Sequence, residues 1–374
     1  MTDHDSPYSF LRLAIGLIIA TLGNVGIWIF VLVMPAIQKE FGIDRATASI
    51  PYVTVMIGFA FGNMYMGRLA DRHGISKTLI ISAVINASAF GLAMLSSSIL
   101  FMSIIHFFIG IAAAATFGPL MADMSHWFFK RRGIAVGVTA SGNYFAGALW
   151  PLILSGTLET DGWRTVYAIV AIVTVMVMLP LSLLLQRKIS EQALRKSDFA
   201  SETMRKKMDL SSEKLVILLS VAGIACCIAM AMPQVHIVAL CVDLGYGPKI
   251  GGEMLSIMLL GGIVSRILSG IIADNIGGIL TLLIGSVFQC IALILYLPSD
   301  VLISLYLVSL IFGLSQGGIV PSYAIIIREY LPSSVAGEKI GNVLMMTILG
   351  MALGGWISGL IYDLTGSYTI AFAH

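Results

Sequence analysis

The chain has 374 residues, of which 58% are hydrophobic and only 11% are charged, and its mean hydropathy is +0.95. About a quarter of the residues in soluble globular domains are charged, so this composition excludes that class and predicts an integral membrane protein. The formal net charge of +2 gives no indication of a nucleic-acid partner, and we expect none.

Long apolar runs recur along the whole chain. A helix needs roughly 20 residues to cross about 30 Å of hydrocarbon. In chain order, eleven runs reach that length, and the expected spans are 12–37, 46–70, 77–96, 98–124, 133–158, 164–186, 214–241, 248–272, 279–297, 301–327 and 335–361. The sequence therefore predicts an all-α membrane protein.

A short motif occurs twice, each time at the end of an apolar run. Residues 67–74 (GRLADRHG) are echoed 203 residues later by residues 270–277 (GIIADNIG). Glycines at 110 and 313, and at 137 and 341, repeat at nearly the same offset. Two similar halves are typical of transporters that rock one half against the other around a central site.

This internal symmetry divides the chain. We expect an N-terminal six-helix bundle at 1–187, a linker at 188–213 and a C-terminal bundle at 214–374. The C-terminal bundle has five expected spans and a stub of a sixth, because symmetry places the last helix at about 368–390. The twelfth helix is thus predicted to be missing, as in a truncated chain or a fragment.

Lysine and arginine, 22 residues in all, concentrate on one side of the expected spans. The positive-inside rule then places the N-terminus and the linker in the cytoplasm, and we expect a multi-pass protein of the inner (plasma) membrane. The polar linker is interpreted as a solvated connection with room for a short surface helix. The four cysteines lack the spacing of metal ligands, so neither a metal nor another cofactor is expected.

The duplicated motif, the twelve-helix plan and the cytoplasmic linker resemble the major facilitator superfamily. Residues 127–142 (WFFKRRGIAVGVTASG) are similar to the entry into the fifth helix in the branch of monocarboxylate transporters and oxalate/formate antiporters. The resemblance implies two pseudo-symmetric six-helix bundles that alternate access to a central site, most simply as a monomer.

The motif residues also have physical roles of their own. Gly67 and Gly270 permit close approach of a neighbouring helix, while Gly74 and Gly277 suit tight turns. Asp71 can accept hydrogen bonds from the exposed amides at a helix N-terminus and complement its dipole.

The resemblance implies that this motif latches the two halves together on the cytoplasmic side. Asp71 and Arg72, together with Asp123, would then bias the conformational equilibrium. The second copy keeps Asp274, but Asn275 replaces the basic residue, so we expect a weaker or different latch there. The alternative is a charged loop without a gating role.

Arg266 is the strongest candidate for substrate binding. It lies in the middle of an apolar run, where a cation costs several kcal/mol unless it faces a polar cavity or a partner. Its planar guanidinium can bind a carboxylate through two parallel hydrogen bonds. In the resembling branch, an arginine four residues ahead of this motif glycine is associated with the substrate carboxylate.

The chain also departs from that branch. Gly262 stands one turn before Arg266, where the monocarboxylate transporters typically carry an aspartate. The first helix has Asn24-Val25-Gly26-Ile27-Trp28 in place of an acidic motif, and residues 343–361 lack the lysine of the oxalate-type antiporters. A single central cation suits a monoanion better than a dianion.

Coupling to an ion is less clearly indicated, because no carboxylate falls at the expected midplane. His236 and His106 are the candidate proton carriers, since histidine can change charge near physiological pH. A buried neutral histidine in a packing role is the alternative for each. Proton coupling, exchange against a counter-anion and uniport therefore all stay open.

Several polar side chains at membrane depth are candidates to line the substrate path. Each can instead serve as an interhelical hydrogen bond, worth only about 0.6–2 kcal/mol. With Arg266 and His236, the candidates are Asn24, Trp28, Asn143, Tyr144, Gln316 and Tyr323.

An intramembrane enzyme is the main competing class. Residues 313–317 (GLSQG) match a Gly-x-Ser-x-Gly pattern, but they lie inside an expected helix and not at the strand-to-helix turn that this motif requires. We therefore expect a secondary carrier for a small organic anion, with a monocarboxylate as the expected substrate. The alternatives are a carrier or efflux protein for neutral or lipophilic compounds and a sensor that binds the same anion.

Overall fold

The computed structural model describes residues 3–43, 45–208, 210–297, 301–369 and 372, and all regular structure in them is helical. The first half holds α1 (Pro7–Gly23), α2 (Val25–Phe41), α3 (Arg45–His73), α4 (Ile75–Met94), α5 (Ile99–Ala115), α6 (Gly118–Trp127), α7 (Arg132–Val173), η1 (Thr174–Met178) and α8 (Leu179–Leu184). After α9 (Glu191–Met208) come α10 (Ser212–Asp243), α11 (Gly247–Ile276), α12 (Gly278–Tyr296), α13 (Leu302–Gln316), α14 (Ile319–Tyr330), η2 (Ser333–Val335) and α15 (Ala336–Thr365).

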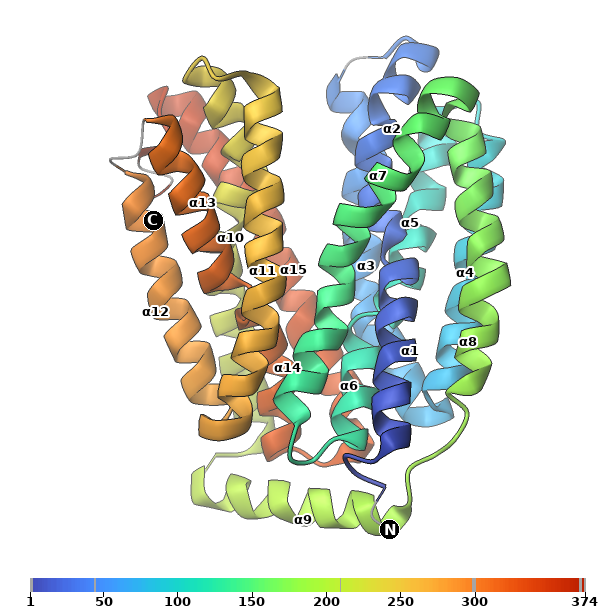
Figure 1. The fold of residues 1–374 in the computed structure, drawn as a ribbon, viewed down its shortest axis with the longest axis vertical. Coiled ribbons are helices and arrows are strands. Elements are labelled where there is room, and N and C mark those ends of the chain that lie inside the picture. The colour runs from blue at the N-terminus through green and yellow to red at the C-terminus, as the bar shows by residue number, and fades with distance from the viewer. Residues whose placement is uncertain (1–2, 44, 209, 298–300, 370–371, 373–374) are drawn as a thin grey trace.

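The helices form two groups with α9 lying across one end of both (Figure 1). Helices α1 to α8 make up one group and α10 to α15 the other, and the ribbons of the two groups diverge away from α9. The expected final helix would start at about residue 368, so it falls largely outside the described residues.

Within the described residues, nine helical stretches are long and apolar enough to cross a membrane. One of them, Arg132–Leu184, runs along the molecule and back, because Gly162 adopts a φ of 79° and turns the chain inside α7. Helix α3 is long enough at 29 residues, but polar residues such as Asn63, Arg68 and Asp71 lower its hydropathy. These two features account for the difference from the eleven predicted spans.

Three of the expected spans are interrupted at membrane depth. The interruptions lie at Asn24 between α1 and α2, at residues 116–117 between α5 and α6, and at residues 317–318 between α13 and α14. Side chains compensate for the lost helical hydrogen bonds: the Gly118 amide donates to Asn63 Oδ1 (3.2 Å) and the Gly318 amide to Ser265 Oγ (3.2 Å). Interrupted helices are tolerated in a bilayer only where protein covers the freed groups in this way.

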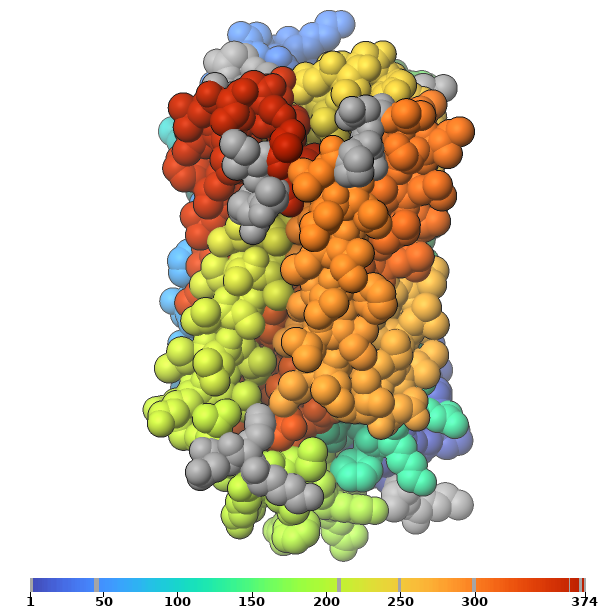
Figure 2. Space-filling view, turned by 90° about the vertical axis from the view of Figure 1, so that its left-hand side faces the viewer, coloured from blue at the N-terminus to red at the C-terminus, as the bar shows by residue number. Residues whose placement is uncertain are grey.

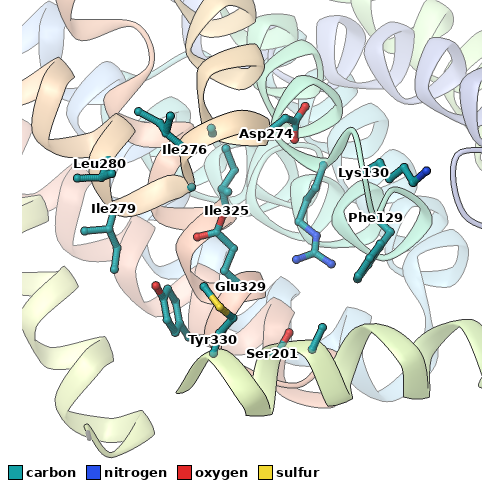
Figure 3. Close-up of a pocket in the computed structure, with 15 residues that line it drawn as sticks. Phe129, Lys130, Ser201, Asp274, Ile276, Ile279, Leu280, Ile325, Glu329 and Tyr330 are labelled. Carbon is teal, nitrogen blue, oxygen red and sulfur yellow. The ribbon is translucent and has the colours of Figure 1, made fainter. Parts of the chain in front are cut away.

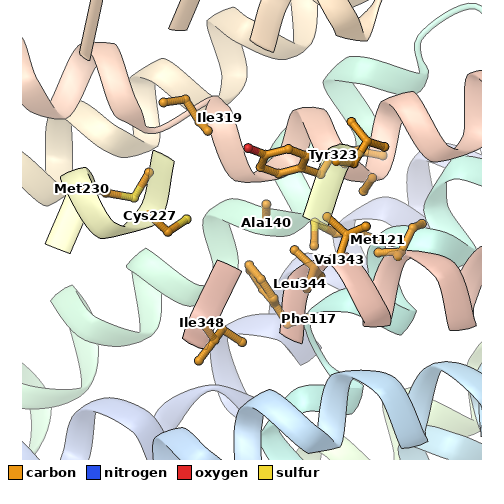
Figure 4. Packing of buried hydrophobic residues seen from close by; sticks show 14 of the residues in the cluster. Phe117, Met121, Ala140, Cys227, Met230, Ile319, Tyr323, Val343, Leu344 and Ile348 are labelled. Carbon is orange, nitrogen blue, oxygen red and sulfur yellow. The ribbon is translucent and has the colours of Figure 1, made fainter. Parts of the chain in front are cut away.

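Apolar packing joins the two halves internally and faces lipid externally. A buried cluster contains Phe117, Met121 and Ala140 of the first half together with Val343 and Leu344 of α15 (Figure 4). On the outer face of the second half, α10 and α12 lie side by side toward the viewer in Figure 2. Exposed apolar side chains of these two helices include Ile217, Val221, Leu283, Phe288 and Ile294, as expected for helices in contact with lipid tails.

Helix α9 does more than connect the halves. The buried Ser197 hydroxyl accepts hydrogen bonds from the guanidinium of Arg132 on α7 (2.9 Å) and from that of Arg328 on α14 (2.7 Å). Asp198 forms an ion pair with Arg328 (3.1 Å) and accepts the amide of Ser333 (2.8 Å). One short segment of α9 is therefore bonded to both halves, a contact that its polar composition did not predict.

Replacing Ser197 by alanine should loosen this end of the molecule. The substitution removes the shared acceptor of two buried guanidiniums, at a cost of about 1–3 kcal/mol. We expect faster tryptic cleavage at the exposed Arg195 and Lys196 and a lower thermal midpoint. In the control Thr203→Ala, the lost hydroxyl bonds only within α9, to the Phe199 carbonyl, so equal cleavage of the two variants would contradict the docking role.

Candidate functional site

The motif aspartate of each half caps a helix of the other half. The Asp71 carboxylate, at the end of α3, accepts the amides of Gly337 (2.9 Å) and Glu338 (2.8 Å) at the start of α15. Asp274, at the end of α11, accepts the amides of Gly133 (2.5 Å) and Ile134 (3.1 Å) at the start of α7. Unpaired N–H groups and the positive end of the helix dipole favour a carboxylate at both places.

Glycine makes this approach possible. A Cβ at Gly67 would overlap the carbonyl of Gly337, and a Cβ at Gly270 would overlap that of Gly133. One turn further along, Gly341 contacts the carbonyl of Asn63 in the same manner. The backbones of the two halves therefore touch at the level of the motif, as was expected of Gly67 and Gly270.

Asp71 and Asp274 make equivalent contacts, since each carboxylate accepts two backbone amides of the opposite half. The weaker or different second latch expected from Asn275 stays a prediction. The Asn275 amide donates to Ile271 of its own helix (2.7 Å), so the bonds of Asp274 do not depend on a basic neighbour. Gly74 and Gly277 both have a φ of 86°, which suits the turns expected there. Arg72 is exposed.

Asp123 is paired within its own half. Its carboxylate forms a bidentate ion pair with Arg12 of α1, at 2.8 and 2.9 Å, and Arg12 is only 2% exposed. The guanidinium also lies over the Trp127 ring, 4.7 Å from its centroid. This geometry anchors α1 to α6 and gives Asp123 no direct bond across the two halves.

Arg266 lies on α11 where it meets α7, and its side chain is 4% exposed. Its Nη1 donates to the carbonyl of Ala140 in the other half, and its Nε donates to the Gly317 carbonyl (3.3 Å), which the break between α13 and α14 leaves free. None of the ion pairs among the described residues includes Arg266. A buried cation thus has neutral partners only.

Tyr144 of α7 covers one face of this guanidinium, with Cζ of Arg266 3.5 Å from the ring centroid. Such stacking is favourable for an arginine in a desolvated site. The ring fits because Gly262 has no side chain: a Cβ there would lie 2.6 Å from Tyr144 Cε2. In this chain an aromatic ring therefore occupies the space beside position 262, where the resembling branch typically has a carboxylate.

Two buried hydrogen-bond donors near Arg266 have no acceptor among the described residues. The Tyr144 hydroxyl donates to Gln316 Oε1 (3.3 Å), and the amide nitrogen of Gln316 is buried without a partner among the described residues. The indole N–H of Trp28, which packs near Tyr144, is also buried and unpaired there. Buried donors without acceptors are costly, so this cluster suits a ligand that only accepts hydrogen bonds.

Asn24 and Asn143 form the neighbouring polar pair. The Asn143 side-chain amide donates to Asn24 Oδ1 (3.0 Å), and Asn24 Nδ2 donates to the Ala20 carbonyl (2.8 Å) and to Thr116 Oγ1 (3.1 Å). These bonds tie α7 to the breaks in the first and fourth spans. They give both asparagines a structural role beside the candidate site.

Three other candidates make their contacts elsewhere in the molecule. The ring of His106 bonds the Met102 carbonyl (2.7 Å) and the Tyr167 hydroxyl (2.9 Å) in the core of the first half. His236 bonds the Gly355 carbonyl (2.9 Å) and the Tyr368 hydroxyl (3.2 Å) in the second half. Tyr323 is buried in the apolar cluster of Figure 4. The structure thus groups Arg266 with Tyr144, Gln316 and Trp28, and places these three apart from it.

A cavity of about 430 Å³ lies near the α9 end, not at Arg266 (Figure 3). Its lining mixes charged side chains, Lys130, Asp274 and Glu329 among them, with apolar ones such as Ile279 and Leu280. The sequence interpretation did not single out Arg132, Arg328 or Ser197 in this region. The sequence did contain an indication for Arg328: an arginine at the end of the apolar run 319–327 requires hydrogen-bond or charge partners.

Comparison with known proteins identifies the fold. The family model of the major facilitator superfamily matches residues 14–299 and 217–373. The chain is 24% identical over 364 residues to monocarboxylate transporter 13 of Rattus norvegicus, covering 95% of this chain and 82% of that protein. It is 25% identical over 333 residues to the agnestins efflux protein AgnL12 of Paecilomyces divaricatus, covering 87% and 74%.

Among solved structures, the proton:xylose symporter XylE bound to 6-bromo-6-deoxy-D-glucose superposes with a TM-score of 0.75 at 15% identity, covering 99% of this chain and 94% of that chain. The fold is thus that of a multi-pass transporter of two helical bundles. The chain belongs to the major facilitator superfamily. It is a membrane transporter and not an enzyme, as predicted.

Neutralising either motif aspartate should shift the balance between conformations. Asp71→Asn or Asp274→Asn removes the charge from a helix N-terminus and weakens one of two amide bonds, at a cost of about 1–2 kcal/mol, or roughly tenfold in population. Spin labels on the α4–α5 and α10–α11 turns, away from α9, should report shorter distances as the α9 end opens. Glu213→Gln, exposed at the start of α10, is the control, and unchanged distances in both aspartate variants would contradict the latch.

Proposed function

We propose that this transporter is a secondary carrier for a small organic anion, most simply a monocarboxylate, that works by alternating access between its two halves. The observation that carries the proposal is the buried Arg266, whose hydrogen-bond partners are backbone carbonyls and which no described carboxylate neutralises. A bound carboxylate would supply the missing charge and accept two parallel hydrogen bonds.

The same geometry suggests how binding and movement are linked. Arg266 Nη1 now bonds the Ala140 carbonyl of the opposite half, and Gly137, one turn away, packs against the Arg266 carbonyl. A carboxylate that takes both terminal nitrogens would compete with Ala140 and weaken this contact between α7 and α11. Opening of the α9 end would further require release of the Asp71 and Asp274 caps.

We infer that the α9 end faces the cytoplasm of the cell and that the protein lies in the plasma membrane. Helix α9 and the adjoining segments hold many of the basic residues, including Lys130, Arg131, Arg195 and Lys206. An excess of lysine and arginine marks the cytoplasmic side of membrane proteins.

Transport is proposed to be coupled either to protons or to a counter-anion. His236 and His106 are the proton-carrier candidates, but both nitrogens of each ring have neutral hydrogen-bond partners in their own half. This bonding is what a packing role requires, and it favours exchange of one anion for another.

A carrier for neutral or lipophilic compounds is the second candidate. It is favoured by the two carbonyl bonds of Arg266, which give the side chain a structural role without any ligand. In that case the substrate would contact the apolar side chains around Tyr144, and Arg266 would only fasten α7 to α11.

Replacing Arg266 by glutamine separates the two candidates. Loss of a charge-assisted bidentate contact should weaken carboxylate binding on the order of 10- to 100-fold. Thermal stabilisation of the purified protein by hexanoate, with hexanamide as the neutral analogue, measures this, because a ligand that binds only the folded state raises the midpoint. Lys77→Gln, an exposed change on α4, is the control. Stabilisation by hexanoate that is unaffected by Arg266→Gln would contradict the proposed function.

A further inference from the structure

The side chains beside Arg266 form an apolar cluster that spans the two halves. Tyr144 of α7 packs with Leu259 and Ile263 of α11, and partly buried Trp28, Phe145, Leu255 and Ile267 surround them. Three of these seven side chains are aromatic. Four of them are only partly covered by protein, which leaves part of their apolar surface accessible.

The spacing along α11 aligns this cluster with the cation. Leu255, Leu259 and Ile263 follow one another at intervals of four residues and therefore lie on one stripe of the helix. Arg266 comes three residues after Ile263 and continues the same stripe. The charge thus stands at one end of an apolar strip, with the hydrogen-bonded pair of Tyr144 and Gln316 beside it.

Tyr144 restricts how an anion can reach Arg266. Its ring covers one face of the guanidinium at 3.5 Å, so a carboxylate has to approach in the plane of the N–H groups. The ring itself is held by its hydrogen bond to Gln316 and by the space at Gly262. A ligand bound in this plane would place the rest of its body against the apolar strip.

The number of cations near the cluster limits how many carboxylates a ligand can carry. Arg266 stacks on Tyr144 of this cluster, whereas the other buried arginines of the described residues, Arg12, Arg132 and Arg328, bond to Asp123, Ser197 and Asp198 elsewhere. A second carboxylate would be desolvated against leucine, isoleucine and aromatic rings without a cation, which is strongly unfavourable. A formate or acetate ion would bind the guanidinium but would leave the strip uncovered.

Resting on the proposed function, we propose that the substrate is an amphiphilic monocarboxylate: one carboxylate, held by Arg266, joined to an apolar body the size of an aromatic ring, held by Trp28, Tyr144 and the α11 strip. Dicarboxylates and the smallest carboxylates are then poor ligands. In this proposal the apolar strip restricts the substrate class as much as the cation does.

The test is equilibrium binding of a matched series to the purified full chain. The ligands are acetate, hexanoate, phenylacetate, the dianion phthalate and the neutral phenylacetamide. Each methylene that becomes buried should tighten binding about fourfold, so hexanoate and phenylacetate should bind at least tenfold more tightly than acetate. Phthalate and phenylacetamide should each bind at least tenfold more weakly than phenylacetate.

Variants assign the effect to the two parts of the site. Trp28→Ala should reduce the ratio of phenylacetate to acetate affinity several-fold, a ratio measured within one protein and thus independent of any loss of stability. Trp356→Ala is the matched control, because Trp356 is 66% exposed on α15, outside the cluster. Arg266→Gln should weaken phenylacetate and leave phenylacetamide unchanged.

The outcomes distinguish the inference from the proposed function. Equal affinities for acetate, hexanoate and phenylacetate, all lost in Arg266→Gln, would overturn the amphiphilic class and leave the anion carrier standing. Equal affinities for phenylacetate and phenylacetamide, both unaffected by Arg266→Gln, would overturn the anion carrier itself. Absence of binding by every acid to folded protein would overturn both.

Discussion

The motif carboxylate of each half lies against the free amides at the start of a helix in the other half, and the rest of the described conformation depends on this reciprocal contact. Asp71 and Asp274 satisfy four amides that a membrane helix otherwise leaves unpaired. The bonds form only because Gly67 and Gly270 let the backbones touch. The contact between the two halves thus consists of touching backbones, with one carboxylate added from each half.

The candidate site lies one helical turn from this contact. Arg266 stands four residues before Gly270, and the corresponding position of the first half, four residues before Gly67, is Asn63. The two halves therefore share the aspartate contact, but only the second half has a cation at this position. The Arg266 carbonyl packs on Gly137 while its guanidinium bonds Ala140, so one residue belongs both to the interface and to the proposed ligand site. A ligand that moves the guanidinium would therefore act directly on the contact between the halves.

The linker adds a third connection at the same end. Ser197 bonds one arginine from each half. Its side chain is small and lies in a polar, charged stretch, so nothing in the sequence indicated that it would be buried. Its burial depends on the two halves presenting Arg132 and Arg328 at matching positions. The N-terminal segment joins this region as well, since Asp5 accepts the amides of Phe129, Lys130 and Arg131.

Composition and repetition alone were sufficient to establish a helical membrane transporter with two related halves, because the bilayer admits few backbone structures and a duplicated motif marks the symmetry. The cost of a cation at membrane depth likewise singled out Arg266. Only the tertiary structure decided what these residues contact: Asp71 meets amides 266 residues away, Tyr144 fills the space at Gly262, and Asp123 pairs with Arg12. Such contacts are set by how two packed bundles dock, and local sequence patterns specify the helices but not their docking.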